Sequence, residues 1–276
     1  MLVNLNDVLK PARENHYGVG LFNVCSLELA KGVLEAAEET QSPVIVGTAE
    51  VLLNVETLQE TADMLIPMAK RASVPVVVHL DHGLTPECCK AALEAGFTSI
   101  MYDCSTDPYD VNKQKIKEMT EIAHAYGATI EAVLGHVIFD ESERSDPSAL
   151  YTDPQQALDF VTATGVDALA IAVGTAHGAY KLPPKLDFER IHQIADIVDC
   201  GLVLHGGSGL TDDDFHRAIQ EGISKVNIFT DIVTAAAKAA YDSYNDGARI
   251  LTDMQPKMVE AVKEAAIKKM NVFKNR

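Results

Sequence analysis

The chain has 276 residues, of which 47% are hydrophobic and 23% are charged, and its formal net charge is −17 at pH 7. These are ordinary values for a globular protein, and they exclude the collagen-like, disulfide-scaffold and disordered classes. The acidic balance disfavours non-specific binding to nucleic acid or to an anionic membrane surface, because both repel an acidic protein. A small anionic substrate stays compatible with it, since a few backbone N–H groups suffice to hold a phosphate.

The cysteines and the first residues predict where the protein resides. The five cysteines show no CxxC or zinc-type spacing, and an odd number cannot pair fully. We therefore expect reduced thiols and a cytoplasmic protein. Residues 1–15 are too polar for a signal peptide, and no apolar run approaches the roughly 20 residues of a membrane span.

Short apolar runs rich in β-branched residues recur along the chain, and we interpret them as strands. Several are apolar on both faces, as the strands of a buried parallel sheet are. The eight predicted strands are residues 18–23, 43–48, 75–80, 98–103, 129–133, 168–173, 202–205 and 225–229.

Segments with helical periodicity separate these strands. In residues 27–39, for example, Leu29, Val33 and Ala37 fall on one face. Several of these segments end in a glycine just before the next strand, which is typical of a helix C-cap. The predicted helices are residues 27–39, 86–95, 113–126, 154–164, 188–198 and 212–222, followed by two helical segments within 232–276.

Strands that alternate with helices imply βαβ units and a parallel sheet. Eight such units fit a (β/α)8 TIM barrel better than an open sheet. No Gly/Ser-rich or Pro-rich linker divides the chain. We therefore predict one α/β domain over residues 1–276, a (β/α)8 barrel with a C-terminal helical extension.

The carboxyl end of every predicted strand carries polar or titratable residues, whereas the strand bodies are apolar. These ends hold Asn23, Thr48, Asp81, His82, Asp103, Glu131, residues 174–178, residues 205–209, Asn227, Thr230 and Asp231. Active sites of barrels of this kind lie at the carboxyl ends of the strands. The pattern therefore predicts a catalytic face.

Three histidines follow three of the strands: His82, His177 and His205. Three imidazoles on one rim are typical of a catalytic zinc site that keeps one position open. A single histidine is more often a satisfied surface or core group. We keep that interpretation for five further histidines: His16, His124, His192, His216 and, packed inside a strand, His79.

Asp81 directly precedes His82. A carboxylate at this position can orient an imidazole or move a proton. It can also cap the following helix, but Thr85 followed by Pro86 is the better capping sequence.

Two glycine-rich segments, 174–178 and 206–209, follow the sixth and seventh strands. Glycine-rich loops near the last strands of a barrel commonly bind phosphate, and Lys181 could add a positive charge. The segment 136–151 is long for a connection of this kind and is acidic. Long loops at this position are often lids, but the composition alone favours a solvated acidic loop.

Taken together, these motifs resemble the class II, metal-dependent ketose-bisphosphate aldolases. They occur in the family's order and span nearly the whole chain, whose length resembles the shorter subgroup with fructose- and tagatose-bisphosphate aldolases. The matching segments are residues 22–23, 78–83, 97–103, 131–135, 150–154, 173–178, 204–209 and 225–230.

The resemblance implies an enzyme that cleaves a phosphorylated ketose, such as fructose or tagatose 1,6-bisphosphate, into dihydroxyacetone phosphate and an aldehyde. His82, His177 and His205 would hold one Zn²⁺ per subunit, which polarises the ketose carbonyl. Asp81 matches the acid/base that exchanges the hydroxyl proton on the aldehyde side. Glu141 falls where the family carries an acid on a mobile loop.

The resemblance also implies a substrate and phosphate site, in which Asn227 contacts a substrate hydroxyl. Its residues are Asn23, Gly178, Lys181, Gly206, Ser208, Asn227 and Thr230. Backbone carbonyls around the glycines would hold a monovalent cation, Na⁺ or K⁺. Arg249 matches an arginine that reaches a neighbouring subunit's site, which implies a homodimer or homotetramer. We place Asp103 and Glu131 as a second metal position or as support.

The chain departs from the family's pattern at three places. Val133 stands where an acid ligates the metal in its resting position, and a valine cannot coordinate. Ile138 and Phe139 replace a Gly-Gly pair before the mobile acid, and bulky Phe229 lies within the last strand motif. These departures suggest a divergent member of the family. An alternative to the bisphosphate substrates is therefore a different ketose 1-phosphate.

Two other hypotheses stay open. A Schiff-base aldolase needs a desolvated lysine near a strand's carboxyl end, but Lys225 enters its strand at the other end and Lys181 is in a loop. A non-catalytic phosphosugar-binding relative would keep the barrel and bind ligand without turnover.

Overall fold

The computed structural model describes residues 1–135, 151–175 and 185–274. Eight strands, β2 to β9, form one parallel sheet that closes on itself through the β2–β9 and β4–β5 pairings. The strands are β2 (Val19–Asn23), β3 (Val44–Ala49), β4 (Val76–Gly83), β5 (Ser99–Tyr102), β6 (Thr129–Leu134), β7 (Ala168–Ile171), β8 (Gly201–Leu204) and β9 (Ile223–Ile228). The predicted eight-stranded barrel is confirmed.

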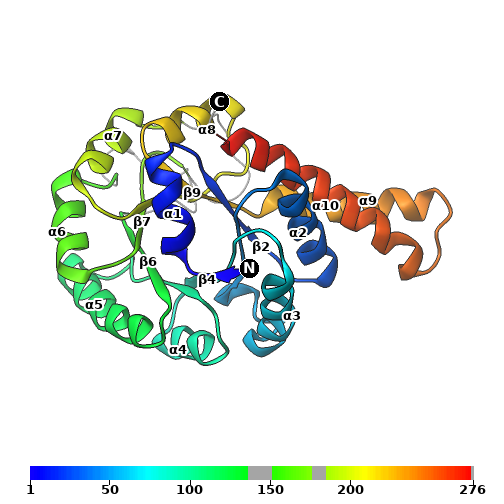
Figure 1. The fold of residues 1–276 in the computed structure, drawn as a ribbon, viewed down its shortest axis with the longest axis horizontal. Helices are drawn as coiled ribbons and strands as arrows, with labels where there is room; N and C mark the ends of the chain where they lie inside the picture. The colour runs from blue at the N-terminus through cyan, green and yellow to red at the C-terminus, as the bar shows by residue number, and fades with distance from the viewer. Residues whose placement is uncertain (136–150, 176–184, 275–276) are drawn as a thin grey trace.

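Helices surround this barrel, as Figure 1 shows. They are α1 (Leu5–Glu14), α2 (Leu27–Thr40), η1 (Glu50–Leu52), α3 (Leu58–Arg71), α4 (Pro86–Glu94), α5 (Tyr109–Ala125), α6 (Pro154–Thr164), α7 (Phe188–Ile197), α8 (Asp212–Gln220), α9 (Thr230–Asn245) and α10 (Leu251–Phe273). Of the expected glycine C-caps, Gly165 ends α6 in the left-handed conformation, with φ 69°. After α4, α5 and α8 the glycine also has a positive φ, but it lies one residue beyond the C-cap. All five cysteines are free.

Two helices were not predicted from the sequence, α1 and α3. Each contains an internal proline, Pro11 in α1 and Pro67 in α3. Proline normally breaks a helix, because it lacks the N–H and its ring crowds the preceding turn. Here capping boxes at Asn4 and Thr57 start the helices, and burial of their apolar faces outweighs the cost of the prolines.

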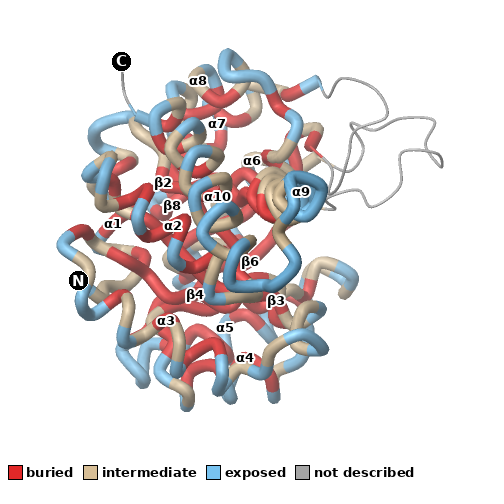
Figure 2. The backbone as a smooth tube through the Cα atoms, turned by 90° about the vertical axis from the view of Figure 1, so that its right-hand side faces the viewer, coloured by how far each residue is buried: buried red, intermediate tan, exposed pale blue. Residues whose placement is uncertain are grey.

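Helix α1 seals the amino-terminal end of the barrel. Its residues Leu5, Val8 and Leu9 are buried with the inward-pointing side chains of the strands, such as Val77 and Val203, in one apolar cluster. The short strand β1 (Leu2–Val3) pairs with the start of β4 and leads the chain into this position. A second, larger cluster lies between the strands and the outer helices. Figure 2 shows this layering, with buried strands inside and exposed helix faces outside.

The predicted C-terminal extension consists of α9 and α10, which lie side by side and project beyond the barrel (Figure 1). Helix α10 packs tightly on α2, because a Cβ on Gly32 would lie only 2.6 Å from Val262. Its end returns to the barrel, where the Gly18 N–H donates to the Phe273 carbonyl at 2.8 Å. None of the described helices is long and apolar enough to cross a membrane.

Candidate active site

The carboxyl ends of the strands gather a layer of buried polar side chains above the apolar floor. Asn23 ends β2, Asp81 and the partly buried His82 lie at the end of β4, and Glu131 comes from β6. His205 directly follows β8, and Asn227 comes from β9. Burial of polar groups costs free energy, so a layer of them needs an explanation. At the carboxyl ends of barrel strands the usual explanation is an active site.

The end of β4 is irregular, and this brings two consecutive side chains to the same site. The β4–β5 register shifts between Leu80 and Gly83, and His82 has a positive φ of 42°. Neighbouring side chains of a regular strand point to opposite faces, so Asp81 and His82 would otherwise separate. The bulge turns His82 back toward Asp81, and such strain in a non-glycine residue is typical of functional sites.

Each of the two imidazoles is oriented by a carboxylate. The Nδ1 of His82 lies 2.8 Å from Oδ2 of Asp103, and the Nε2 of His205 lies 2.9 Å from Oε1 of Glu131. A carboxylate accepts, so each ring donates its proton at that nitrogen and presents a lone pair at the other. The two remaining nitrogens, His82 Nε2 and His205 Nδ1, lie 2.9 Å apart, with the rings at 85°.

Asp81 is held between two amides. Its Oδ2 accepts from Nδ2 of Asn23 at 2.7 Å, and its Oδ1 accepts from Nδ2 of Asn227 at 3.1 Å. Burial would raise the pKa of Asp81, but the positive charges of His82 and Lys225 outweigh burial and hold it below its usual range. Asp81 is therefore an ionised, buried proton acceptor. The predicted alternative role as a helix cap is filled by Thr85, whose side chain accepts from the Cys88 N–H at the start of α4.

The donor atoms of Asp81, His82 and His205 all lie within 4.8 Å of one another. Two converging imidazole lone pairs repel each other unless a proton or a cation lies between them, and nitrogen ligands of this kind suit zinc. Burial lowers the pKa of His205, which favours the neutral ring that metal ligation requires. Burial would also lower the pKa of His82, but the carboxylates of Asp81 and Asp103 outweigh it and raise that pKa, so a positive charge is favoured between the two rings. The residues present therefore fit a transition-metal ion.

Comparisons with known proteins agree with this geometry. The family model "Fructose-bisphosphate aldolase class-II" matches residues 3–276. A fructose-bisphosphate aldolase of Staphylococcus aureus is 37% identical over 278 residues, 99% of this chain and 97% of the relative. The crystal structure of the YdjI aldolase from Escherichia coli K12 is 36% identical with a TM-score of 0.90, covering 99% of this chain and 97% of that one.

The chain belongs to the class II fructose-bisphosphate aldolase family. It is therefore an aldolase, a carbon–carbon lyase. Members of this family are typically metal-dependent, which is consistent with the histidine pair. A third relative, the fructose-bisphosphate aldolase of Geobacillus stearothermophilus, is 41% identical over 249 residues, 86% of this chain and 84% of the relative.

A second polar group of this aldolase lies deeper in the barrel, and sequence reasoning missed its role. Lys225 is fully buried, and its Nζ lies 2.7 Å from Oε2 of Glu131. Burial would raise the pKa of Glu131, but Lys225 and His205 outweigh it and lower that pKa to about 2. The Nδ1 of His79 lies 2.8 Å from the Ser99 hydroxyl, so the prediction that His79 is packed inside its strand is confirmed. The sequence did contain a signal for the role of Lys225. It lies two residues before Asn227 in the same strand, and side chains two residues apart in a strand point to the same face.

The structure places Asp103 and Glu131 beside the imidazoles rather than at a separate cluster. Burial would raise the pKa of Asp103, but hydrogen bonds from His82 and Ser105 lower it to about 2. Both carboxylates are thus ionised acceptors for ring N–H groups. This arrangement matches the supporting role among the two roles predicted for them.

The other predicted residues fall into two groups. Gly206, with φ 68°, and half-buried Ser208 follow His205, while exposed Thr230 begins α9 and exposed Arg249 lies beyond it near the tip of the arm. Glu141, His177, Gly178 and Lys181 lie outside the described residues, as do Ile138 and Phe139.

Two of the departures from the family's pattern are visible. Val133 points into the barrel, where it belongs to the inner apolar cluster. Phe229 is half-buried just before α9, and its carbonyl accepts from the N–H groups of Ile232 and Val233.

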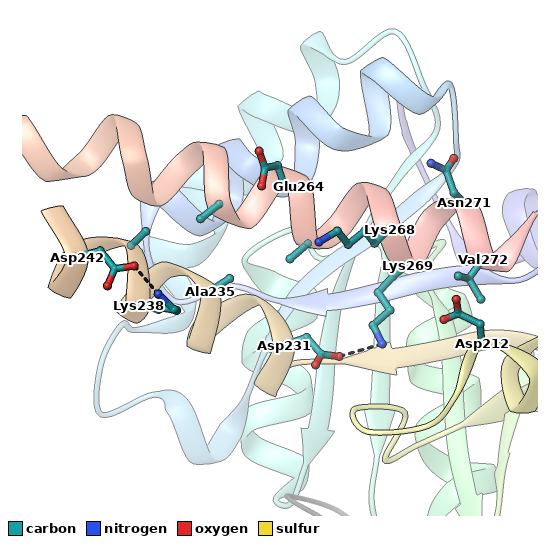
Figure 3. Close-up of a pocket in the computed structure, with 13 residues that line it drawn as sticks. Asp212, Asp231, Ala235, Lys238, Asp242, Glu264, Lys268, Lys269, Asn271 and Val272 are labelled. Carbon is teal, nitrogen blue, oxygen red and sulfur yellow. Dashed lines mark hydrogen bonds and ion pairs between the residues drawn. The ribbon is translucent and has the colours of Figure 1, made fainter.

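A groove of about 720 Å³ lies elsewhere, between α9 and α10. Figure 3 shows its alanine-lined walls and its charged rim, where Lys238 pairs with Asp242 and Lys269 with Asp231. These two ion pairs take up four of the seven charged residues that line the groove, and none of its described lining residues is a histidine or a cysteine. We assign the chemistry to the strand ends and not to this groove.

Proposed function

We propose that this aldolase is zinc-dependent and cleaves a phosphorylated ketose of the fructose or tagatose 1,6-bisphosphate type into dihydroxyacetone phosphate and an aldehyde. The observation that carries the proposal is the convergence of His82 Nε2 and His205 Nδ1, 2.9 Å apart, beside the ionised Asp81. His177 is the proposed third ligand. When bound, Zn²⁺ supplies a Lewis acid for the ketose carbonyl.

In the proposed cleavage, Asp81 acts as the general base. Its carboxylate accepts the proton of the substrate hydroxyl on the aldehyde side, and the O–H electron pair forms the aldehyde C=O. The carbon–carbon bond breaks, and its electron pair stays on the dihydroxyacetone phosphate half. Glu141 is the proposed acid that returns a proton to that carbon. The two amides that grip Asp81 keep its oxygens in one orientation.

Asn23 is the proposed contact for a substrate hydroxyl. Its Nδ2 donates to Asp81, while its buried Oδ1 has no hydrogen-bond partner among the described residues. A buried acceptor without a donor is costly, and a substrate O–H satisfies it. Asn227 is proposed to contact the substrate beside Asp81. Gly206, Ser208 and Thr230, with Gly178 and Lys181, are the proposed phosphate site, next to a Na⁺ or K⁺ held by backbone carbonyls.

We also propose that the enzyme works as a homodimer or a larger homo-oligomer, through the arm of α9 and α10. Tyr241, Tyr244, Ile250 and Leu251 are exposed near the tip of the arm, where large apolar side chains suit a subunit contact. Arg249 lies among them, and its guanidinium stacks over the Tyr244 ring at 4.9 Å. From there it is proposed to reach the distal phosphate in a neighbouring subunit.

The experiment is release of dihydroxyacetone phosphate from a panel of phosphorylated ketoses, each with and without a metal chelator. The panel contains fructose and tagatose 1,6-bisphosphates and ketose 1-phosphates with other tails. Chelator-sensitive release supports the proposal, and the best substrate defines the aldehyde half. No release with zinc supplied, together with ligand binding by calorimetry, would instead support a non-catalytic phosphosugar-binding protein.

A different ketose 1-phosphate is the second candidate substrate, and Phe229 favours it. A half-buried ring at the end of β9 is next to the residues proposed for substrate and phosphate. A bulky side chain there favours a smaller or less charged aldehyde half. The panel separates this case by its order of kcat/KM values. The Schiff-base alternative is tested by borohydride trapping with substrate, which we expect to fail because Lys225 is engaged by Glu131.

A further inference from the structure

Lys225 is the only buried lysine among the described residues. Its side chain runs inside the barrel from β9 and ends between two polar partners. The Nζ lies 2.7 Å from Oε2 of Glu131 and donates to Oδ1 of Asn227 at 2.9 Å. Burial of a lysine ammonium costs free energy unless the ammonium is paired and hydrogen-bonded. A buried lysine at this position therefore needs an explanation.

Both partners of Lys225 hold a second residue of the site with their other polar atom. Glu131 uses Oε1 for the His205 Nε2, 2.9 Å away. Asn227 uses Nδ2 for Oδ1 of Asp81, 3.1 Å away. Lys225 therefore contacts the residue that holds the proposed metal ligand His205. It also contacts the residue that holds the proposed general base Asp81.

The contact with Asn227 decides which way its amide faces. The oxygen and the nitrogen of an asparagine amide are nearly equal in size, so packing alone does not distinguish the two orientations. Lys225 can only donate, and it therefore selects the orientation with Oδ1 inward. In that orientation Nδ2 donates to Asp81; in the inverted one Oδ1 would face a carboxylate and repel it.

The contact of Lys225 with Glu131 orients the Glu131 carboxylate toward the proposed metal ligand His205. With one oxygen on Lys225, the carboxylate offers the other to the His205 N–H, which directs the His205 Nδ1 lone pair toward His82. Among the described residues, another nitrogen near Oε2 is the His79 Nε2 at 3.9 Å. Burial and the charge of Lys225 lower the pKa of His79 to about 3, so in the wild-type chain the ammonium of Lys225 is the positive charge that faces Oε2.

We propose that Lys225 is a positioning residue that couples the two halves of the active site, holding His205 toward the metal through Glu131 and Asp81 toward the substrate through Asn227. Lys225 itself touches neither the metal nor the reacting atoms. The inference rests on the proposed zinc-dependent function. It adds a residue whose loss impairs both metal affinity and proton transfer.

The test compares Lys225→Met, Glu131→Gln and the double variant with the wild-type chain and with Lys90→Met, an exposed lysine on α4. Zinc dissociation constants are measured by chelator competition, apo-protein stability by thermal melting, and kcat and KM separately. We expect Lys225→Met to weaken zinc binding about 10- to 100-fold, the range for residues that orient metal ligands. We expect kcat to fall with little change in KM, and Lys90→Met to match the wild type.

The double variant separates positioning from simple charge compensation. A glutamine at 131 keeps an acceptor for the His205 N–H and removes the charge that lost its partner, so zinc affinity and apo stability should largely return. The kcat should stay low, because Asn227 still lacks the donor that orients it. Recovery of kcat together with zinc affinity would mean that Lys225 only balances charge, and would overturn the proposal.

A further variant keeps the test valid where Lys225→Met does not fold. Asn227→Asp retains an oxygen for Lys225 but cannot donate to Asp81, so we expect it to lose kcat while its zinc affinity stays near that of the wild type. Unchanged kcat in this variant, or wild-type zinc affinity and kcat in Lys225→Met, contradicts the inference. Failure of the wild-type chain itself to bind zinc would instead contradict the proposed function.

Discussion

The two ends of the barrel interior differ in the kind of side chain that they bury. At the amino-terminal end, α1 and the inward side chains of the strands form an apolar cluster, in which Leu5 and Val77 are fully buried. At the carboxyl end, the same barrel buries Asp81, Glu131 and Lys225. Apolar burial stabilises the fold by roughly 25 cal/mol per Å², whereas burial of charges costs free energy even when they are paired. The apolar end therefore raises the free energy of unfolding, whereas the buried charges of the polar end lower it and provide the groups for chemistry.

The largest effect is expected at the polar end, for His205→Ala. This change removes one of the two converging imidazole nitrogens and leaves Glu131 without its N–H donor. We expect zinc binding and cleavage to be lost while the barrel still folds. Zinc content by mass spectrometry and the dihydroxyacetone phosphate assay check this, with His192→Ala, on the exposed face of α7, as the matched histidine control. Wild-type activity in His205→Ala would refute the metal assignment.

Next in size is Asp81→Ala, which removes the proposed general base. We expect the protein to keep zinc and to lose turnover about 10²- to 10⁴-fold, the usual contribution of general acid–base catalysis. Because the donor atoms of Asp81, His82 and His205 lie within 4.8 Å, zinc content must be measured on the same sample. Loss of zinc in this variant would make Asp81 a metal ligand or its support.

The apolar end is tested by Leu9→Ala in α1, which leaves a cavity against β8, since Leu9 fills the space above Gly201. We expect unfolding to become easier by about 2–5 kcal/mol, as for other buried leucines. The kcat/KM of the folded enzyme should not change. Urea unfolding and kinetics well below the transition measure the two quantities. An altered kcat/KM would show that the two ends are coupled and would break the comparison.

A smaller effect at the polar end is expected for Asp103→Ala, which removes the acceptor of the His82 N–H at 2.8 Å. We expect zinc affinity to fall about 10- to 100-fold, because the ring loses its fixed tautomer and orientation. Chelator competition measures this, and added zinc should restore most of the activity. Activity that stays low at saturating zinc would assign Asp103 a further part in catalysis.

Much of this aldolase was determined by its sequence alone. The eight strands were predicted to within a few residues, because apolar runs, helical periodicity and capping residues such as Thr85 act locally. The same patterns placed His82 and His205 at strand ends, on the face where the structure brings them together. A prediction of this kind needs only the topology of a barrel, which collects all strand ends at one rim.

Other features were decided only by the tertiary structure. Helices α1 and α3 form despite their prolines because their apolar faces have partners distant in the chain. The pairs His82–Asp103, His205–Glu131 and His205–His82 are 21, 74 and 123 residues apart, so no local pattern encodes them. The sequence placed Lys225 at the end of its strand that faces away from the site, and only closure of the barrel brings its ammonium to Glu131 and Asn227. Strand register and barrel closure determine these contacts, because both are properties of the whole sheet.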